Sequence, residues 1–123
     1  MGSEPRPSPA GSHADAEARL RSRLAEVEAR ITAQRAVVDG IVASVRGENV
    51  DDEHDPEGAT LAWERQQAAA LAAEAAVERD ELRAALDRVG AGTYGFCEVC
   101  GRAIPAGRLE VRPAATRCVE HAR

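Results

Sequence analysis

Lysine is absent from this sequence: all 16 basic residues are arginine, they face 21 acidic residues, and the formal net charge is −5. A net acidic chain is a poor binder of polyanions, so the charge argues against a protein that coats nucleic acid. Aromatic residues number three, Trp63, Tyr94 and Phe96. Because so few large side chains cannot fill a thick two-layer core, the many Ala, Glu, Leu and Arg residues favour an elongated helical protein.

Long apolar runs are also lacking. No stretch of 18 apolar residues is present, so we expect no membrane-spanning helix. Residues 1–12, MGSEPRPSPAGS, lack the apolar core of a signal peptide, and their Pro, Ser and Gly content predicts a disordered N-terminal arm, in part a cloning remnant. We therefore expect a cytoplasmic protein whose three cysteines stay reduced.

The first half of the chain carries a heptad pattern. Between residues 20 and 45, apolar residues recur at alternating steps of four and three, which predicts a long α-helix with one apolar seam. Ser12 is placed to cap the start of this helix, and Gly47 and Asn49 to end it. The seam comprises Leu20, Leu24, Val27, Ile31, Val38, Ile41 and Val45, with Gln34 at its one polar position.

A second helix is predicted after Asp55 and Pro56, a pair typical of an N-cap and a first turn. It should continue to about Val89 and stop at Gly90 and Gly92. Its seam has a strict period of seven, reinforced by two further leucines: Leu61, Ala68, Ala75, Leu82 and Val89, with Leu71 and Leu86. Small alanines opposite branched residues should let the two helices approach closely.

The two helices predict a mainly α protein built on an antiparallel coiled-coil hairpin, residues 13–92. Each helix covers more than thirty residues, or roughly 50 Å at the standard rise. The linker of about nine residues is short enough to force an antiparallel arrangement. We expect a monomer, because the hairpin satisfies both seams within one chain. Self-association of the helices into a dimer is the alternative.

The predicted tip of the hairpin, residues 48–59, is strongly acidic and has no basic residue. It does not fit a calcium-binding EF-hand loop: counted from Asp51, the sixth position is Pro56 and the twelfth is Ala62, where glycine and glutamate are required. A solvated, charged turn is the simpler interpretation of this cluster. Its acids are Glu48, Asp51, Asp52, Glu53, Asp55 and Glu57.

The C-terminal residues 93–123 contain two potential ligand pairs for a metal. Cys97 and Cys100 precede Gly101, and Cys118 and His121 follow after seventeen intervening residues. This spacing is typical of a structural zinc site, with one Zn²⁺ held by three thiolates and one imidazole. Residues 114–120 favour a helix, on which Cys118 and His121 would share a face. With all four positions filled, no open site is left for a catalytic water.

Other interpretations of the cysteines are weaker. A redox-active Cys-x-x-Cys would need a thioredoxin-like βαβ setting, which the sequence does not provide. Covalent haem attachment needs histidine directly after the second cysteine, where Gly101 stands. For the fourth position, the alternative is that His121 is an unliganded residue near a frayed chain end. His13 and His54 have no ligand-like neighbours.

With these motifs in view, the chain resembles the DksA/TraR-type zinc-finger transcription regulators, small bacterial proteins that bind RNA polymerase. The resemblance runs from about residue 31 to residue 121 and is strongest over "YGFCEVCGRAIPAGRLEVRPAATRC". It implies a coiled-coil hairpin on a zinc-finger base, and a non-catalytic function: the acidic tip enters the polymerase secondary channel and modulates initiation, often together with guanosine tetraphosphate. The tip residues this implies are Asp51, Asp52, Asp55, Glu57 and Ala59.

The sequence departs from the family pattern in three places. The fourth ligand is His121 where cysteine is usual, and the chain stops at Arg123 without the C-terminal helix of longer members. The family's tip pattern D-x-x-D-x-A is not intact. Aligned from the cysteines it falls on His54, Glu57 and Ala59; in another register Asp52 and Asp55 meet Glu57 where alanine belongs.

The resemblance also implies nucleotide binding where the hairpin base meets the zinc module. Arg108 and Arg112 are the candidate contacts to nucleotide or polymerase, but the facing residues Glu78 and Glu81 would repel phosphate. We therefore expect weak or absent dependence on guanosine tetraphosphate.

Two other function classes remain open. A zinc-ribbon nucleic-acid binder would use the arginines of the C-terminal module on phosphates, with Tyr94 and Phe96 as the nearby base-stacking candidates. A coiled-coil adaptor for another partner is the third possibility. We expect no sequence-specific DNA binding and no enzymatic activity, because no nucleophile–base pair is evident.

Overall fold

The structure, a computed structural model, describes residues 13–47 and 56–122. For residues 41–47, 56 and 57 it describes the backbone alone. The N-terminal arm predicted for residues 1–12 lies outside the described residues. Within the described ranges no helix is both long enough and apolar enough to cross a membrane.

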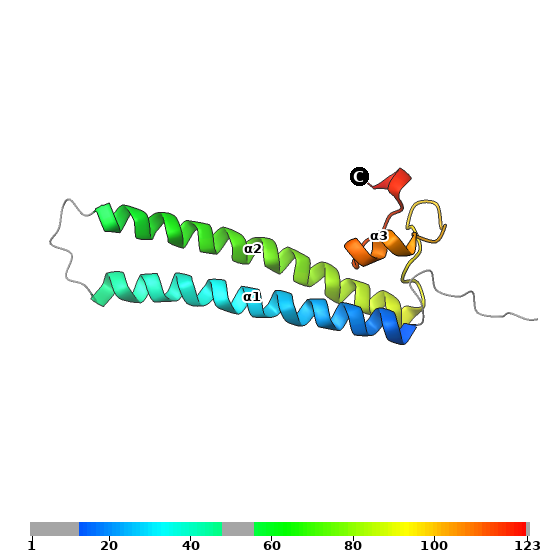
Figure 1. The fold of residues 1–123 in the computed structure, drawn as a ribbon, viewed down its shortest axis with the longest axis horizontal. Coiled ribbons are helices and arrows are strands. Elements are labelled where there is room, and N and C mark those ends of the chain that lie inside the picture. Colours follow the sequence, from blue (N-terminus) through cyan, green and yellow to red (C-terminus); the bar gives the residue numbers. More distant parts are fainter. Residues whose placement is uncertain (1–12, 48–55, 123) are drawn as a thin grey trace, which may run out of the picture. The chain divides into compact units, whose positions relative to one another are not determined.

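Two long helices dominate the fold. Helix α1, His13–Gly47, has 35 residues and helix α2, Pro56–Ala91, has 36. They run antiparallel as a hairpin, followed by the short helix α3, Ala106–Val111, and the 3₁₀ turn η1, Val119–His121 (Figure 1). The described residues form no strand beyond an isolated bridge between Phe96 and Ala103. The predicted mainly α hairpin with a C-terminal cysteine cluster is confirmed.

The chain divides into two compact units. Of the described residues, the terminal unit comprises 13–25 and 80–122, and the central unit comprises 26–47 and 56–79. The terminal unit therefore holds the start of α1, the end of α2 and the whole cysteine module. The central unit holds the middle of the coiled coil.

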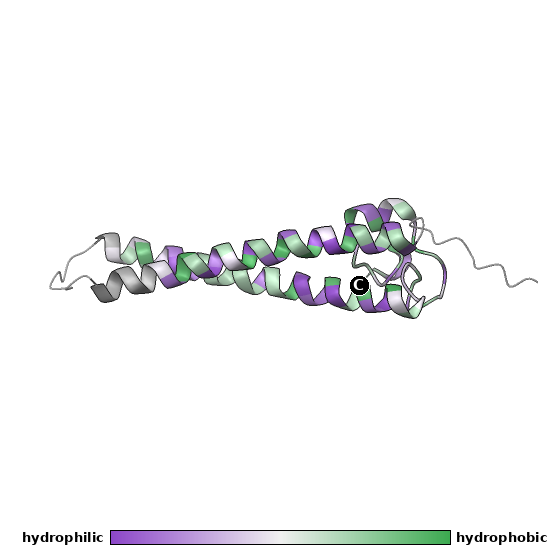
Figure 2. Ribbon diagram, turned by 90° about the horizontal axis from the view of Figure 1, so that it is seen from below, coloured by the Kyte–Doolittle hydropathy of each residue, from purple (hydrophilic) through white to green (hydrophobic). Residues whose placement is uncertain are grey.

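The central unit is a two-helix seam with alanine on one side. Val27 and Ile31 of α1 are buried, at 0% and 4% exposure, and α2 contributes three buried alanines. Outside this seam, Arg30 of α1 and Glu78 of α2 form an ion pair at 3.6 Å. Hydrophobic positions recur along both helices between hydrophilic ones (Figure 2). The buried alanines are Ala68, Ala72 and Ala75.

The predicted seam of α2 is correct in its period but not in every member. Leu71 was expected to reinforce the seam, yet it is 39% exposed, while the adjacent Ala72 is buried. A small residue at the interface allows the helix backbones to come close, and the neighbouring leucine then points outward. The terminal unit shows the same pattern: Ala85 is fully buried, whereas the adjacent Leu86 is half-buried.

Helix α2 ends just before a glycine with a left-handed backbone conformation. The helix continues through Gly90, which was predicted as a stop, and ends at Ala91. Gly92 has φ 77°, a left-handed conformation that favours glycine. Its N–H bonds the carbonyl of Val89 at 3.2 Å, and the N–H of Thr93 bonds the carbonyl of Arg88 at 2.9 Å. This pair of bonds is a Schellman motif, and it turns the chain towards the cysteines.

The seam makes a direct stability prediction. Replacing Ile31 by aspartate places an unpaired carboxylate where the side chain is 4% exposed, and it removes a buried isoleucine. We expect a loss of about 3 kcal/mol or more in the free energy of unfolding. Urea titration followed by far-ultraviolet circular dichroism measures it.

The matched control is Ala33→Asp, which adds the same charge to an exposed position of the same helix. That substitution should cost well under half as much. Equal losses for the two variants would contradict the seam.

Candidate metal centre

The first ligand pair sits on a tight turn. The N–H of Gly101 bonds the carbonyl of Cys97 at 2.9 Å, and the N–H of Cys97 bonds the carbonyl of Arg102 at 2.8 Å. Gly101 has φ 74°, a left-handed conformation that favours glycine. The N–H of Val99 also points at the Cys97 sulfur, 3.4 Å away. This turn brings both thiols of the pair to one side.

A small apolar core supports the turn. Ile104 and Leu109 are essentially fully buried, and Tyr94 and Cys97 join them at 5% and 3% exposure. Leu109 comes from α3, a helix that the sequence analysis did not predict. Pro105 immediately before Ala106 was the available signal, since proline is suited to the start of a helix. Burial of Leu109, more than the propensity of six residues, explains why this helix forms.

The second ligand pair is placed differently from the prediction. Residues 114–118 are not helical; Cys118 is extended, with φ −72° and ψ 173°, and precedes the 3₁₀ turn η1. The helix predicted for residues 114–120 is therefore wrong, because the carbonyls of Ala114, Thr116 and Arg117 accept hydrogen bonds from other segments. The expectation that Cys118 and His121 point together still holds. Residues three apart eclipse in a 3₁₀ turn, and the Cys118 Sγ and His121 Nδ1 atoms lie 3.1 Å apart.

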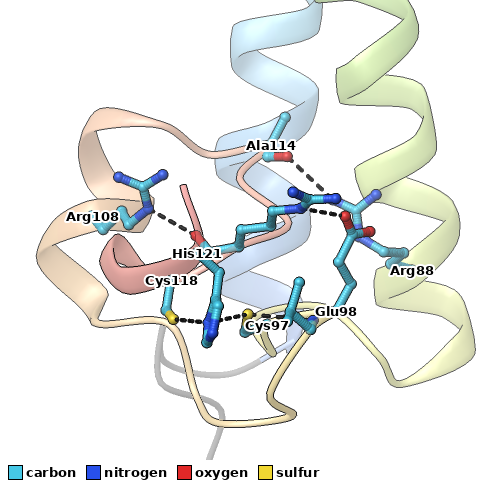
Figure 3. Close-up of polar contacts among 9 residues, drawn as sticks. Arg88, Cys97, Glu98, Arg108, Ala114, Cys118 and His121 are labelled. Carbon is cyan, nitrogen blue, oxygen red and sulfur yellow. Dashed lines mark hydrogen bonds and ion pairs between the residues drawn. The ribbon is translucent and has the colours of Figure 1, made fainter. Parts of the chain in front are cut away.

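All four predicted ligand residues come together. Their ligand atoms lie within 4.8 Å of one another. Cys100 Sγ is 3.8 Å from Cys118 Sγ. Cys97 Sγ is 3.7 Å from His121 Nδ1 (Figure 3). Tetrahedral zinc, with bonds of about 2.3 Å to sulfur and 2.0–2.1 Å to nitrogen, implies separations of about 3.8 Å and 3.6 Å. The donor set and its spacing fit one structural zinc ion.

The electrostatics of the thiols also suit a cation. Burial disfavours the Cys97 thiolate, but the backbone N–H groups of Cys118, Cys100 and Val99 stabilise it and lower its pKa to about 6. For Cys100, the backbone N–H of Arg102 favours the thiolate, but burial and the neighbouring thiols outweigh it and raise the pKa. Several thiolates this close together repel one another. A bound divalent cation removes that repulsion.

His121 can be tested by substitution. Because η1 already directs this position at the three sulfurs, we expect His121→Cys to retain one zinc per chain. We expect His121→Ala to weaken zinc binding by about tenfold or more, since a fourth protein ligand is lost. Competition with a chromogenic chelator measures both affinities. Unchanged affinity in His121→Ala would make His121 a surface residue.

The predicted tip is largely beyond what the structure describes. Asp51, Asp52 and Asp55 lie outside the described residues, and the side chain of Glu57 is among those not described. Ala59 is described; it lies in α2 and is exposed. The tip therefore stays a prediction.

The two predicted arginine contacts have different surroundings. The Nε of Arg108 donates to the carbonyl of Arg117 at 2.9 Å, so part of this guanidinium serves the module itself. Arg112 follows α3 and its side chain is exposed. Arg117, another arginine of this module, pairs with Glu98 at 2.7 Å.

Tyr94 and Arg88 make contacts in the zinc module that the sequence analysis did not predict. Tyr94 was considered as a base-stacking residue, but it is 5% exposed and its hydroxyl donates to the carbonyl of Pro113 at 2.7 Å. Arg88 donates to the carbonyl of Ala114 at 3.3 Å (Figure 3). Burial raises the pKa of Tyr94 above its ordinary value, against the opposing effect of Arg19 and Arg88. The hydroxyl therefore stays protonated and available as a donor at neutral pH.

Comparison with known proteins finds a family model and several relatives that this chain resembles. Residues 92–120 match the family described as the prokaryotic dksA/traR C4-type zinc finger. The chain is 37% identical over 70 residues to the uncharacterized protein YteA of Bacillus subtilis, covering 57% of this chain and 29% of that protein. It is 56% identical over 36 residues to the RNA polymerase-binding transcription factor DksA of Caulobacter vibrioides, covering 29% of this chain and 25% of that protein.

Among solved structures, transcription factor DksA2 from Pseudomonas aeruginosa matches with a TM-score of 0.74 and 25% sequence identity. That match covers 88% of this chain and 78% of DksA2. With the two curated relatives, in contrast, the matched region spans less than a third of their length. The family's zinc finger is of C4 type, whereas the fourth ligand candidate here is His121, one residue past the matched region.

Proposed function

We propose, from the premise that this chain is a zinc-finger protein of the DksA/TraR type, that it binds RNA polymerase and regulates transcription without catalysing a reaction. The observation that carries the proposal is the combination of two matches in one chain. The zinc-finger sequence of residues 92–120 occurs together with a helical hairpin that matches transcription factor DksA2. The name of the Caulobacter relative supplies the partner, RNA polymerase.

The mechanism we propose is insertion of the hairpin tip into the polymerase secondary channel, where its acids modulate initiation. The acidic residues between positions 48 and 57 support it, because they outnumber the local bases six to none. Such a cluster repels itself and gains most when it meets cations on a partner. The closed four-ligand zinc site supports a structural and not a catalytic metal.

Direct nucleic-acid binding is the competing function, and the module does not favour it. Tyr94 is buried, so it cannot stack on a base, and Arg117 is paired with Glu98. Binding through phosphates alone would fall steeply with added salt. A salt titration of duplex DNA binding therefore separates the two proposals: we expect no measurable binding at physiological ionic strength.

Capture of core RNA polymerase by the zinc-loaded chain is the direct test. We expect stoichiometric capture from purified components, measured by size-exclusion chromatography. The matched control is the chain after metal chelation. Absence of a complex with purified polymerase, under conditions where zinc is bound, would reject the proposal.

We further propose that the protein acts as a monomer in the cytoplasm, where its thiols stay reduced.

Dependence on guanosine tetraphosphate is proposed to be weak or absent. Arg112 offers an exposed cation, but Glu81, an acid of the same unit, is exposed as well. Carboxylates near a phosphate weaken its binding by like-charge repulsion. We expect micromolar nucleotide to change the regulatory effect by less than about twofold. An enhancement of several fold in a transcription assay would contradict this.

A further inference from the structure

Residues 113–117, which we call the strap, connect α3 to the second ligand pair. They contain no helix or strand, yet they place Cys118 against the thiols of the first pair. Because the strap makes no regular structure of its own, its carbonyl groups need donors from elsewhere. The contacts of those carbonyls therefore determine where the ligands arrive.

Four of the five strap carbonyls accept a hydrogen bond from another segment. Tyr94 donates to Pro113 at 2.7 Å and Arg88 to Ala114 at 3.3 Å. The N–H of Glu98 donates to Thr116 at 2.8 Å, and Arg108 donates to Arg117 at 2.9 Å.

The first two donors stand apart from the others. Glu98 lies inside the first ligand pair and Arg108 in α3, whereas Arg88 is in the last turn of α2 and Tyr94 follows it directly after the Schellman motif. The two residues are also linked to each other, because the N–H of Tyr94 bonds the carbonyl of Arg88 at 3.2 Å. Arg88 thus closes the helix with its backbone and reaches the strap with its side chain.

We propose that Tyr94 and Arg88 are positioning residues for the zinc ion, which act by holding the strap that carries Cys118 and His121. Neither contacts the metal. Their bonds to Pro113 and Ala114 form together with metal binding, so zinc occupancy is coupled to the C-terminal end of α2. All of these residues belong to the terminal unit.

The coupling arises because the hydrogen bonds from Tyr94 and Arg88 are too weak to order the strap without the metal. Fixing the backbone of five residues costs more conformational entropy than two hydrogen bonds return. Without the metal, the strap loses the bonds that join Cys118 to the first ligand pair. With the metal, Cys118 is held directly after the strap, and the donors at the start of the strap then bond at little further entropic cost. Two ligands that stabilise the same ordered segment strengthen each other.

The decisive variant is Tyr94→Phe, which keeps the buried ring and removes the hydroxyl that donates to Pro113. We expect its zinc affinity, measured on the full chain by competition with a chelator, to fall about tenfold. Arg88→Met should lower the affinity by less, because its bond is longer, and Arg88→Lys should recover part of the loss. Arg112→Met is the matched control, an exposed arginine just before the strap, and should leave the affinity unchanged.

A purely structural role gives a different result. If the strap were already in place without metal, Tyr94→Phe would destabilise the zinc-loaded and zinc-free proteins equally, and the zinc affinity would stay constant. That outcome overturns the proposal. Should Tyr94→Phe fail to fold, equal affinities for Arg88→Met, Arg88→Lys and Arg112→Met would overturn it as well. Neither measurement involves RNA polymerase, so its result is independent of the proposed function.

Discussion

Replacement of Cys97 by serine is expected to abolish stoichiometric zinc binding and to loosen the module of residues 93–122. Cys97 is the one buried ligand of the four, and Ile104 and Leu109 of the same module are also buried. A serine hydroxyl is not a zinc ligand at neutral pH, so one quarter of the coordination is lost. Since structural zinc supplies the folding free energy of small modules, we expect at least about a hundredfold weaker binding.

Zinc content per purified chain and protection of the module from protease measure this effect. Val99→Ser is the matched control, because it introduces the same residue into the same turn at an exposed side chain. Circular dichroism should show most helical signal retained in Cys97→Ser, since α1 and α2 contribute 35 and 36 residues and α3 only 6. One tightly bound zinc per chain in the Cys97→Ser protein would contradict the assignment.

Neutralising the tip should separate polymerase binding from regulation. In the combined variant Asp52→Asn, Asp55→Asn and Glu57→Gln, three of the six acids between positions 48 and 57 lose their charge while keeping their size. We expect polymerase affinity to change by less than about threefold, because the helices and the zinc module supply most of the contact area. We expect the effect on open-complex lifetime to disappear, because it depends on carboxylates placed among the cations of a narrow channel.

Open-complex lifetime on a responsive promoter, with polymerase binding measured in parallel, tests this expectation. The matched control neutralises three exposed acids elsewhere on the two helices, Asp39→Asn, Glu64→Gln and Glu74→Gln. The control has the same change in net charge and should regulate normally. If the tip variant regulates as well as the parent chain, the tip is a solvated turn and the proposed mechanism fails, although polymerase binding stands.

Much of the helical hairpin was predictable because its determinants are local and periodic. The heptad spacing predicted both long helices, and Pro56 marked the start of the second. The exact seam was less predictable. Whether Leu71 or Ala72 faces the partner depends on how closely two backbones approach, a property of the pair of helices and not of either sequence. The choice between Gly90 and Gly92 depended likewise on which glycine completes the closing hydrogen bonds.

The metal ligands were predictable because the chemistry of zinc imposes their spacing. The residues that position them were not. Arg88 and Tyr94 lie 26 and 19 positions before the strap residues they contact, and no periodic pattern connects them. Their acceptors are backbone carbonyls, which every residue possesses. The strap sequence therefore does not reveal which of its residues accept these hydrogen bonds.

Natural variation should differ between the donor residues and the strap residues that accept their hydrogen bonds. The donors act through particular side chains, whereas the strap responds through atoms that any amino acid supplies. In a set of relatives sharing this module, we expect the half-buried positions Ala114 and Ala115 to vary among small residues. We expect the positions of Arg88 and Tyr94 to keep hydrogen-bond donors. A comparison of strap sequences alone would then make this segment look like a dispensable connector, although it positions Cys118 and His121, half of the zinc ligands.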